Sequence, residues 1–377
     1  MTAVSQPCVS EPLDSESSPP ETFPKRRTLR RGTDLVAAGL AEDAALVDQA
    51  GEIFPVAVTA HLAESMNAGD ALARQFIPQK EELAQGETDR SDPIGDHVHG
   101  PVRGIIHRYP DRLLLTPILL CPAYCRFCFR REDVGQDDAV LSDAELDAAF
   151  AYIESRKEIW EVILSGGDPL MLPPKRLAAI VARLSAISHV AVIRIHSRVP
   201  VLDPARVTPA LIAALDTEKA MFVVIHCNHP QELNEPVRAA CRSLVKAGLP
   251  LLSQTVLLKG VNDNAKTMAD LMRALVANRI KPYYLHHPDL APGTAHFRLP
   301  IERGQEVMRQ LRGRLSGLCQ PSYVLDIPGG FGKVPVGPNY LEPDGVGGYR
   351  VADWQGGRHS YPASPDATAD IAGKSPV

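Results

Sequence analysis

The stretch that decides the fold is residues 113–131, LLLTPILLCPAYCRFCFRR. Residues 113–120 form a near-continuous apolar run, which is typical of a parallel strand buried on both faces, and three cysteines follow directly. Similar apolar runs recur along the chain. They predict strands at residues 160–164, 190–195, 221–225, 251–258 and 282–285, and a short further strand at 323–326.

Amphipathic segments between these runs predict helices from Ser142 onward and at residues 173–187, 208–215, 234–247, 266–277 and 301–315. Ser142 and Glu145 match a capping box, Pro209 suits a first helical turn, and Gly248 suits a helix end. Six strand–helix units predict an α/β fold with a parallel sheet and right-handed crossovers. A closed barrel of this kind needs eight strands, so we expect an incomplete (βα)6 TIM-like barrel.

Polar residues gather where the predicted strands end: Cys121, Asp168, His196, His226, Lys259 and His286. The carboxyl ends of parallel strands lie at one edge of the sheet, where such folds carry their chemistry. For any single residue, the alternative is that a polar loop simply begins there. Six together favour a site.

Composition excludes several classes of protein. The 377 residues carry 40 Lys and Arg against 45 Asp and Glu, a net charge of −5, and 45% are hydrophobic. This is an ordinary globular balance, without the basic excess of a nonspecific nucleic-acid binder. Aromatic residues make up only 5%, too few for stacking along single strands. No apolar run reaches the length of a membrane span, so we expect no membrane partner and no nucleic-acid partner.

The chain divides into five expected parts. Residues 1–31 are rich in Ser, Pro and Glu and predict a disordered arm without a secretory signal. Residues 32–100 predict an N-terminal helical region followed by a polar connector, which itself extends to about residue 110. Residues 101–315 predict the partial barrel, 316–355 a C-terminal segment, and 356–377 a flexible tail.

The three clustered cysteines, Cys121, Cys125 and Cys128, have the spacing C-x3-C-x2-C. Three thiolates on one loop can each bind one iron of a 4Fe–4S cluster and leave the fourth iron open for a substrate. The alternative is half of a zinc site, which needs a fourth ligand and usually a second paired motif. The other cysteines, Cys8, Cys227, Cys241 and Cys319, stand alone. An odd number of cysteines without a signal indicates a cytoplasmic protein with a metal or redox site.

Near the C-terminus, three glycines precede Lys333 in the segment DIPGGFGK. A phosphate-binding loop would need a Ser or Thr after the lysine, but Val334 stands there. A lysine on a flexible glycine tether can instead reach into a barrel and form a Schiff base. The usual alternative for a single lysine is a solvated surface side chain.

The cysteine motif, followed by the Gly-Gly-Asp-Pro turn after the next strand, resembles the radical S-adenosylmethionine superfamily. Eight segments together resemble the lysine 2,3-aminomutase family: HRYPDR (107–112), CPAYCRFCFRR (121–131), SGGDPL (165–170), IRIHSRVPV (193–201), NHPQE (228–232), QTVLLKGVND (254–263), HFRLP (296–300) and PGGFGKVPVGPNY (328–340). The resemblance implies an isomerase with a 4Fe–4S cluster, S-adenosylmethionine and pyridoxal 5′-phosphate. In that family a 5′-deoxyadenosyl radical abstracts a hydrogen, and a 1,2-amino migration converts L-lysine to β-lysine.

The resemblance also implies residue roles. Cys121, Cys125 and Cys128 match the cluster ligands, and Lys333 the pyridoxal phosphate lysine. Arg130 matches the partner of the substrate carboxylate, and Asp289 and Asp326 match two carboxylates that hold the substrate ε-ammonium. S-adenosylmethionine would be contacted by Gly166, Gly167, Asp168, His226 and Gln254. The cofactor phosphate would be held by Arg108, Tyr109 and Arg112.

The two aspartates favour a cationic substrate side chain, since paired carboxylates offset the cost of desolvating an ammonium. A glutamate-handling relative has Lys and Asn at these positions. Arginine 2,3-aminomutases also need carboxylates here and remain an alternative. So do a branch that supplies β-lysine for modification of elongation factor P, and a noncatalytic metal-binding scaffold.

The sequence also departs from the family. His286 stands where clostridial-type members have Tyr, and the loop HHPDLAPGTA is particular to this chain. Those members bind a structural zinc through a cysteine-containing C-terminal extension, whereas no cysteine follows Cys319 here. We therefore expect no structural zinc and a homodimer. The expected electron donor is an external one-electron reductant of the flavodoxin or ferredoxin type.

Overall fold

The computed structural model describes residues 27–84, 86–136, 138–345 and 347–362. The expected disordered arm and flexible tail therefore lie largely outside the described residues. No helix among the described residues is long and apolar enough to cross a membrane.

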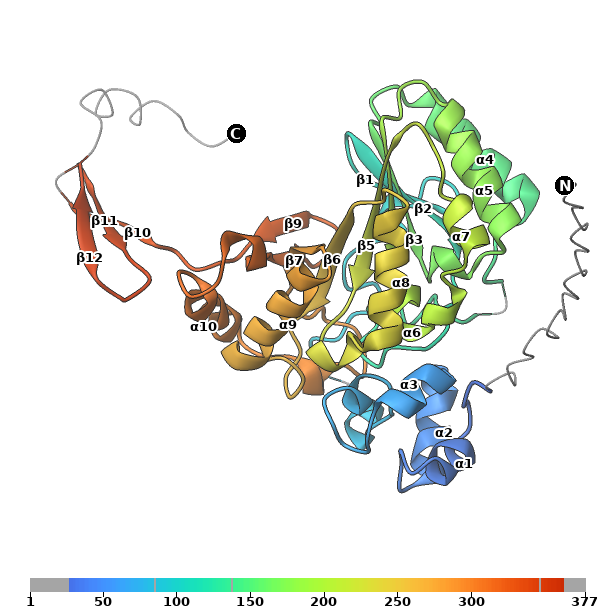
Figure 1. Ribbon diagram of the computed structural model, residues 1–377, viewed down its shortest axis with the longest axis horizontal. Helices are drawn as coiled ribbons and strands as arrows, with labels where there is room; N and C mark the ends of the chain where they lie inside the picture. The colour runs from blue at the N-terminus through green and yellow to red at the C-terminus, as the bar shows by residue number, and fades with distance from the viewer. Residues whose placement is uncertain (1–26, 85, 137, 346, 363–377) are drawn as a thin grey trace, which may run out of the picture.

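One twisted sheet organises the chain (Figure 1). Its strands are β1 (Ile105–Tyr109), β2 (Arg112–Ile118), β3 (Glu161–Gly166), β4 (Val192–Ser197), β5 (Ala220–His226), β6 (Leu251–Val256), β7 (Ile280–His286), β8 (Ser322–Ile327) and β9 (Gly332–Pro335). They lie side by side in chain order, and β2 to β8 are all parallel. The short strand expected at 323–326 is β8, the seventh parallel strand.

Helices cover the outer face of this sheet: α4 (Asp143–Ser155), α5 (Pro174–Ala186), α6 (Val199–Leu202), α7 (Pro209–Ala213), α8 (Glu235–Lys246), α9 (Ala265–Ala277) and α10 (Ile301–Leu311). Their apolar residues recur at helical spacing because one face of each helix is buried against the strands. In α8, for example, Val237, Cys241 and Leu244 are buried. The expected α/β fold with an incomplete (βα)6 barrel is confirmed. The last helix ends at Leu311 rather than at 315.

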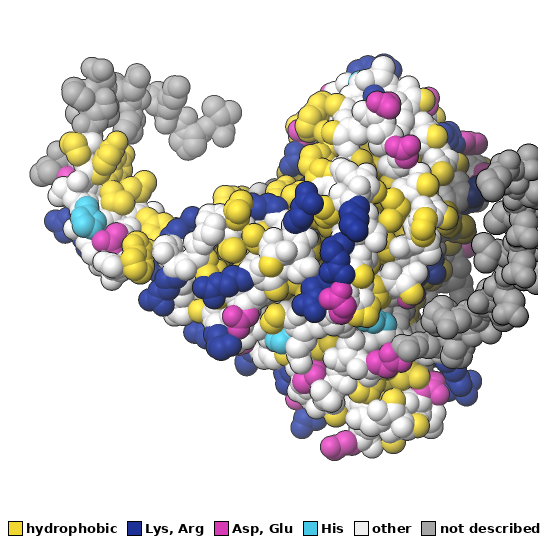
Figure 2. Space-filling model, viewed as in Figure 1, with side chains coloured by type: hydrophobic (Ala, Val, Ile, Leu, Met, Phe, Trp, Pro, Cys, Tyr) yellow, Lys and Arg dark blue, Asp and Glu magenta, His cyan; other side chains and the backbone are white. Residues whose placement is uncertain are grey.

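Lys and Arg side chains gather over α8 and α10 on the face shown in Figure 2. Several of them are paired with acids of the same helix: Arg238 and Arg242 with Glu235, and Arg309 with Glu306. These charges form the solvated side of amphipathic helices.

The barrel is nearly closed but lacks a continuous ladder. β1 and β9 are the two edges of the sheet, each antiparallel to its single neighbour. A side chain bridges these edges: the Tyr109 hydroxyl accepts a hydrogen bond from the backbone N–H of Lys333 at 2.7 Å. The sheet therefore curls until its first and last strands touch.

The N-terminal region packs at one end of the barrel, through α1 (Gly32–Ala37), α2 (Ala44–Ile53) and α3 (Ala60–Ser65) (Figure 1). Thr59 donates to the carbonyl of Leu202, and the backbone N–H of Tyr124 donates to the carbonyl of Ala57. The expected boundary at residue 31 is not sharp, because Leu29 pairs with Val58.

The expectation that residues 79–110 form a plain connector is wrong. This segment contributes strand β1, the buried Asp96 and the buried Glu82. Its many polar and turn-forming residues hid these roles, because its carboxylates are buried by pairing with arginines from elsewhere in the chain.

The C-terminal part forms a separate antiparallel sheet of β10 (Leu341–Pro343), β11 (Tyr349–Ala352) and β12 (Arg358–Tyr361), at the far end of the molecule in Figure 1. Residues 358–361 were expected in a flexible tail. They are a strand because each of them pairs with β11. Short 3₁₀ helices fill the remaining connections: η1 (Ala73–Gln75), η2 (Lys80–Leu83), η3 (His97–His99), η4 (Pro169–Met171), η5 (Pro204–Arg206), η6 (Pro230–Glu232), η7 (Ala295–Phe297) and η8 (Gly317–Cys319).

Candidate active site

A cavity of about 650 Å³ lies inside the barrel and is lined by the three clustered cysteines and by Lys333. Every other residue predicted for the site lines it too: Arg108, Tyr109, Arg112, Arg130, Gly166, Gly167, Asp168, His226, Gln254, Asp289 and Asp326. The cysteines and the lysine are about 200 residues apart in sequence, so the fold brings together what the sequence keeps separate. Of the six polar strand-end residues, Lys259 is the one absent from this lining.

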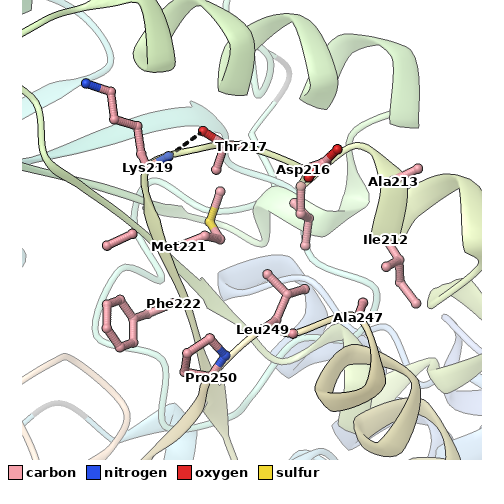
Figure 3. A pocket seen from close by; sticks show the side chains of 13 residues that line it. Ile212, Ala213, Asp216, Thr217, Lys219, Met221, Phe222, Ala247, Leu249 and Pro250 are labelled. Carbon is pink, nitrogen blue, oxygen red and sulfur yellow. Dashed lines mark hydrogen bonds between the residues drawn. The ribbon is translucent and has the colours of Figure 1, made fainter.

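A second hollow, of about 470 Å³, opens near the amino-terminal ends of β5 and β6 (Figure 3). It is lined by residues such as Thr217, Lys219, Met221 and Leu249, and by none of the predicted site residues. Parallel sheets carry their chemistry at the opposite edge.

The cysteine loop follows β2 and is held in a tight turn, in which the N–H of Cys128 donates to the carbonyl of Cys125 at 3.0 Å. Burial raises the pKa of Cys128 to about 12 and also raises the pKa values of Cys121 and Cys125. Metal ions would reverse this by stabilising the thiolates. In the described part of the chain, no three His, Cys, Asp or Glu side chains surround a single-ion site.

Lys333 lies on β9 directly opposite Asp326 on β8. Its ammonium is 2.7 Å from Asp326 Oδ1, and His286 Nδ1 is 3.6 Å from Oδ2. Burial alone would raise the pKa of Asp326, but His286 and Lys333 together hold it well below its usual range. The expected flexible tether is therefore wrong: Lys333 is fixed in a strand, because the glycines before it form a tight turn between β8 and β9.

Asp289 has the opposite electrostatic character. Burial and the neighbouring charge of Asp326 raise the pKa of Asp289 to about 7, although Lys333 and Arg130 act in the other direction. The two predicted carboxylates therefore differ: Asp326 is paired and ionised, whereas Asp289 changes its protonation state near pH 7.

Sequence reasoning missed Asp96, which forms ion pairs with two arginines that line the cavity. Its Oδ2 accepts from Arg130 Nε at 2.7 Å, and its Oδ1 accepts from Arg108 Nη2 at 2.8 Å. Arg108 Nη1 in turn lies 3.7 Å from Asp326 Oδ1. A chain of alternating charges thus runs from Arg130 to Lys333. No local pattern marked Asp96, because only the fold brings its partners together.

The glycine turn after β3 packs on the cysteine loop. The N–H of Gly167 donates to the carbonyl of Ile118, and the N–H of Asp168 donates to that of Leu120, both at 2.9 Å. The Asp168 carboxylate accepts hydrogen bonds from the Ser197 hydroxyl and from the N–H groups of Leu170, Arg198 and Val199. Burial raises its pKa to about 6 despite these bonds.

His226 and Gln254 are neighbours in register on β5 and β6. The His226 ring lies 5.7 Å from the ring of Phe127 in the cysteine loop, and its Nε2 is 3.0 Å from Asn228 Oδ1. Burial lowers the pKa of His226 well below its usual value, so the ring is neutral. Across the barrel, the Arg112 guanidinium stacks over the Tyr109 ring at 3.9 Å.

A second missed residue is Arg198, whose buried guanidinium donates to Cys125 Sγ at 2.7 Å. A charged residue immediately after β4 was a signal that could have identified it.

Comparison with known proteins agrees with this geometry. Residues 115–272 match the family model of the radical SAM superfamily, and residues 308–374 match that of lysine-2,3-aminomutase. The chain is 44% identical to an L-lysine 2,3-aminomutase of Acetoanaerobium sticklandii, over 73% of this chain and 66% of that protein. It is 39% identical to an L-lysine 2,3-aminomutase of Methanococcus maripaludis, over 84% and 74%. It is 36% identical to a glutamate 2,3-aminomutase of Clostridioides difficile, over 76% and 68%.

The matched region spans about two thirds of the length of the Acetoanaerobium sticklandii relative. The chain belongs to the lysine 2,3-aminomutase family of the radical S-adenosylmethionine superfamily.

Proposed function

We propose that this protein is a lysine 2,3-aminomutase, an isomerase that moves the α-amino group of L-lysine to the β-carbon. One observation carries the proposal: a triad of cysteines and a lysine amine line one cavity, together with carboxylates suited to a second amine. One-electron chemistry and imine chemistry can therefore act on the same substrate molecule.

The residues present fit the cofactors of the family. Three cysteines on one loop provide the thiolates for a 4Fe–4S cluster, and Lys333 provides the amine for pyridoxal phosphate. Arg108, Tyr109 and Arg112 offer two guanidinium groups and a hydroxyl for its phosphate. Gly166, Gly167, His226 and Gln254 line the same cavity as the three cysteines, where S-adenosylmethionine would bind. When bound, these groups supply hydrogen abstraction from carbon and a conjugated ring that carries the migrating nitrogen.

The chain's own residues position the substrate. Arg130 is anchored through its Nε by Asp96, and its Nη1 makes only a long hydrogen bond of 3.4 Å to Ser165 Oγ, so its outer edge can turn to the substrate carboxylate. Asp326 holds the ammonium of Lys333 when no ligand is present. With Lys333 serving pyridoxal phosphate, Asp326 and Asp289, which line the same cavity, would together offer carboxylates to the ε-ammonium of lysine. Asp168 accepts a hydrogen bond from the backbone N–H of Arg198 and so fixes the chain that follows β4.

The charge of the cavity favours lysine over glutamate. A substrate carboxylate beside Asp326 and Asp289 would add negative charge next to the ionised Asp326, whereas an ammonium would offset that charge and favour the ionised form of Asp289. Arginine offers the same sign of charge on a longer side chain and is the competing substrate. We also propose that the protein is a cytoplasmic homodimer that takes its electrons from a flavodoxin- or ferredoxin-type donor.

The test is anaerobic reconstitution with iron, sulfide, pyridoxal phosphate and S-adenosylmethionine, followed by parallel incubation with lysine, arginine and glutamate. We expect β-lysine as the product. The Lys333→Arg variant keeps a cation beside Asp326 but cannot form the imine, and it should give no product. Cleavage of S-adenosylmethionine without any β-amino acid would reject the proposal, and β-arginine as the main product would reassign the substrate.

A further inference from the structure

The contact between Arg198 and Cys125 is a direct hydrogen bond between a cation and a cluster-ligand sulfur. Arg198 Nη1 donates to Cys125 Sγ at 2.7 Å, and the side chain is buried. Among the described residues, no other side chain donates a hydrogen bond to any of the three clustered sulfurs. The contact is therefore singular within the site.

Arg198 is held rigidly in this orientation. Its other terminal nitrogen, Nη2, donates to Glu232 Oε2 at 2.8 Å and to Gln75 Oε1 at 2.7 Å. Its guanidinium carbon lies 4.7 Å from the Phe76 ring centre and 5.4 Å from that of Phe127. Its backbone N–H is fixed by Asp168 at 2.7 Å. The guanidinium is thus oriented before any cluster binds.

The two terminal nitrogens of the Arg198 guanidinium donate to different groups, which is not the pattern of a simple ion pair. An arginine that serves only to form an ion pair commonly grips a carboxylate with two parallel N–H bonds. Here one terminal nitrogen serves Glu232, and the other is directed at a sulfur. Glu232 is itself fixed by the N–H groups of Asn228 and His229, so it cannot follow Arg198 if that residue moves.

We propose that Arg198 sets the reduction potential of the cluster. Reduction adds one electron, and part of that charge spreads onto the thiolate sulfurs. An N–H donor carrying positive charge stabilises the reduced form more than the oxidised form, so it raises the potential. Glu232 moderates this effect by neutralising the guanidinium. Arg198 therefore makes cluster reduction easier, and Glu232 limits how much easier. This inference rests on the proposed cluster site.

The experiment is a redox titration of the reconstituted protein, without S-adenosylmethionine, followed by electron paramagnetic resonance of the reduced cluster. We expect Arg198→Met to lower the ratio of reduced to oxidised cluster about tenfold at a fixed applied potential, a shift of 59 mV for one electron. Glu232→Gln should shift the ratio in the opposite direction, because it leaves the guanidinium charge uncompensated. General damage to the site would not produce opposite shifts.

Arg194→Met is the matched control. Arg194 is a buried arginine on β4, is paired with Glu161 at 3.0 Å, and makes no hydrogen bond to sulfur. We expect the cluster of the Arg194→Met variant to have the same reduction potential as the cluster of the wild type. Iron and sulfide content is measured first in every variant.

If Arg198→Met fails to assemble a cluster, the Glu232→Gln variant provides the test. A higher ratio of reduced to oxidised cluster than in the wild type supports the proposal, and an unchanged or lower ratio overturns it. Unshifted potentials in both variants, or an equal shift in Arg194→Met, would overturn the inference, even if S-adenosylmethionine binding were weakened. A wild-type protein that binds no cluster would overturn the cluster assignment and this inference together.

Discussion

At the scale of single residues, the site depends on two aspartates that the same cavity treats differently. Asp326 is ionised because His286 and Lys333 face it. Burial and the nearby charge of Asp326 outweigh the opposing effect of Lys333 and Arg130 on Asp289, so its pKa is raised to about 7. A substrate ammonium would stabilise the ionised form of Asp289, which makes its protonation state a control on substrate binding.

The resulting prediction is that KM for lysine falls as pH rises through 7. A raised acid pKa means that Asp289 is largely protonated at pH 6 and ionised at pH 8, a change of about tenfold in the ionised fraction. Lysine keeps its charge over this range. We expect KM at pH 6 to exceed that at pH 8 by roughly tenfold, as measured by initial rates at saturating cofactors.

The Asp289→Asn variant should have a high KM that does not change over this range. The pH dependence of folding stability is a second test of the raised pKa of Asp289. The folded protein binds this proton more tightly than the unfolded chain, so Asp289 makes stability decrease as pH rises from about 4 to about 7. Asp289→Asn should therefore raise Tm at pH 8 more than at pH 5. A KM that is flat with pH in the wild type would refute the prediction, and Asp270→Asn, on the exposed face of α9, is the control.

At the scale of elements, the sequence predicted the barrel well because each strand and helix carries its own pattern. Buried apolar runs give β2 to β8, and amphipathic periods give α4, α5 and α7 to α10. The short α6 was not predicted, because all four of its residues are buried and it has no polar face. β1 and β9 were missed because they are short edge strands in which only the first residue is fully buried. The ligand residues on them were still found, since the family motifs include Arg108, Tyr109 and Lys333.

Asp96 and Arg198 were missed for a different reason. Each acts through partners from other elements, and a single sequence does not show which distant residues will meet, although the position of Arg198 directly after β4 marked it as a candidate. The resemblance implies that Gly167 contacts S-adenosylmethionine, and this stays a prediction. The structure adds a role that the sequence did not indicate, a close approach of Gly167 to the backbone of Leu119 and Leu120.

The prediction for this element is that Gly167→Ala loses the cluster. A Cβ at Gly167 would lie 2.5 Å from the carbonyl oxygen of Leu120, and backbone atoms cannot move aside as a flexible side chain can. We expect a loss of at least ~1–3 kcal/mol in stability and a low iron content after reconstitution, because β3 would be pushed away from the cysteine loop.

Gly317→Ala is the control for this change, since a Cβ there meets open space. It should keep wild-type iron content and wild-type Tm. Gly167→Ala with a full complement of iron would show that the turn tolerates displacement.

At the scale of the whole molecule, the N-terminal region and the barrel act as one unit around the cysteine loop. Arg126, between two cluster cysteines, is fully buried and lies 2.6 Å from Glu82 of the N-terminal region. Its N–H also donates to the carbonyl of Gln75. The loop that would hold the cluster is therefore clamped from outside the barrel, by a segment whose composition indicated only a connector.

This clamp predicts that breaking one side of the Arg126–Glu82 pair costs more than removing both. Glu82→Gln leaves the charges of Arg126 and Arg131 buried without their shared carboxylate, which costs about 3–5 kcal/mol. Replacing Arg126 and Glu82 by an apolar pair leaves only Arg131 without that carboxylate and so costs less. Denaturant unfolding should therefore give Glu82→Gln a lower free energy of unfolding than the double variant Arg126→Met, Glu82→Leu. Glu306→Gln, which breaks an exposed pair with Arg309, should cost under about 1 kcal/mol. Equal losses from Glu82→Gln and Glu306→Gln would mean that the N-terminal region does not clamp the loop.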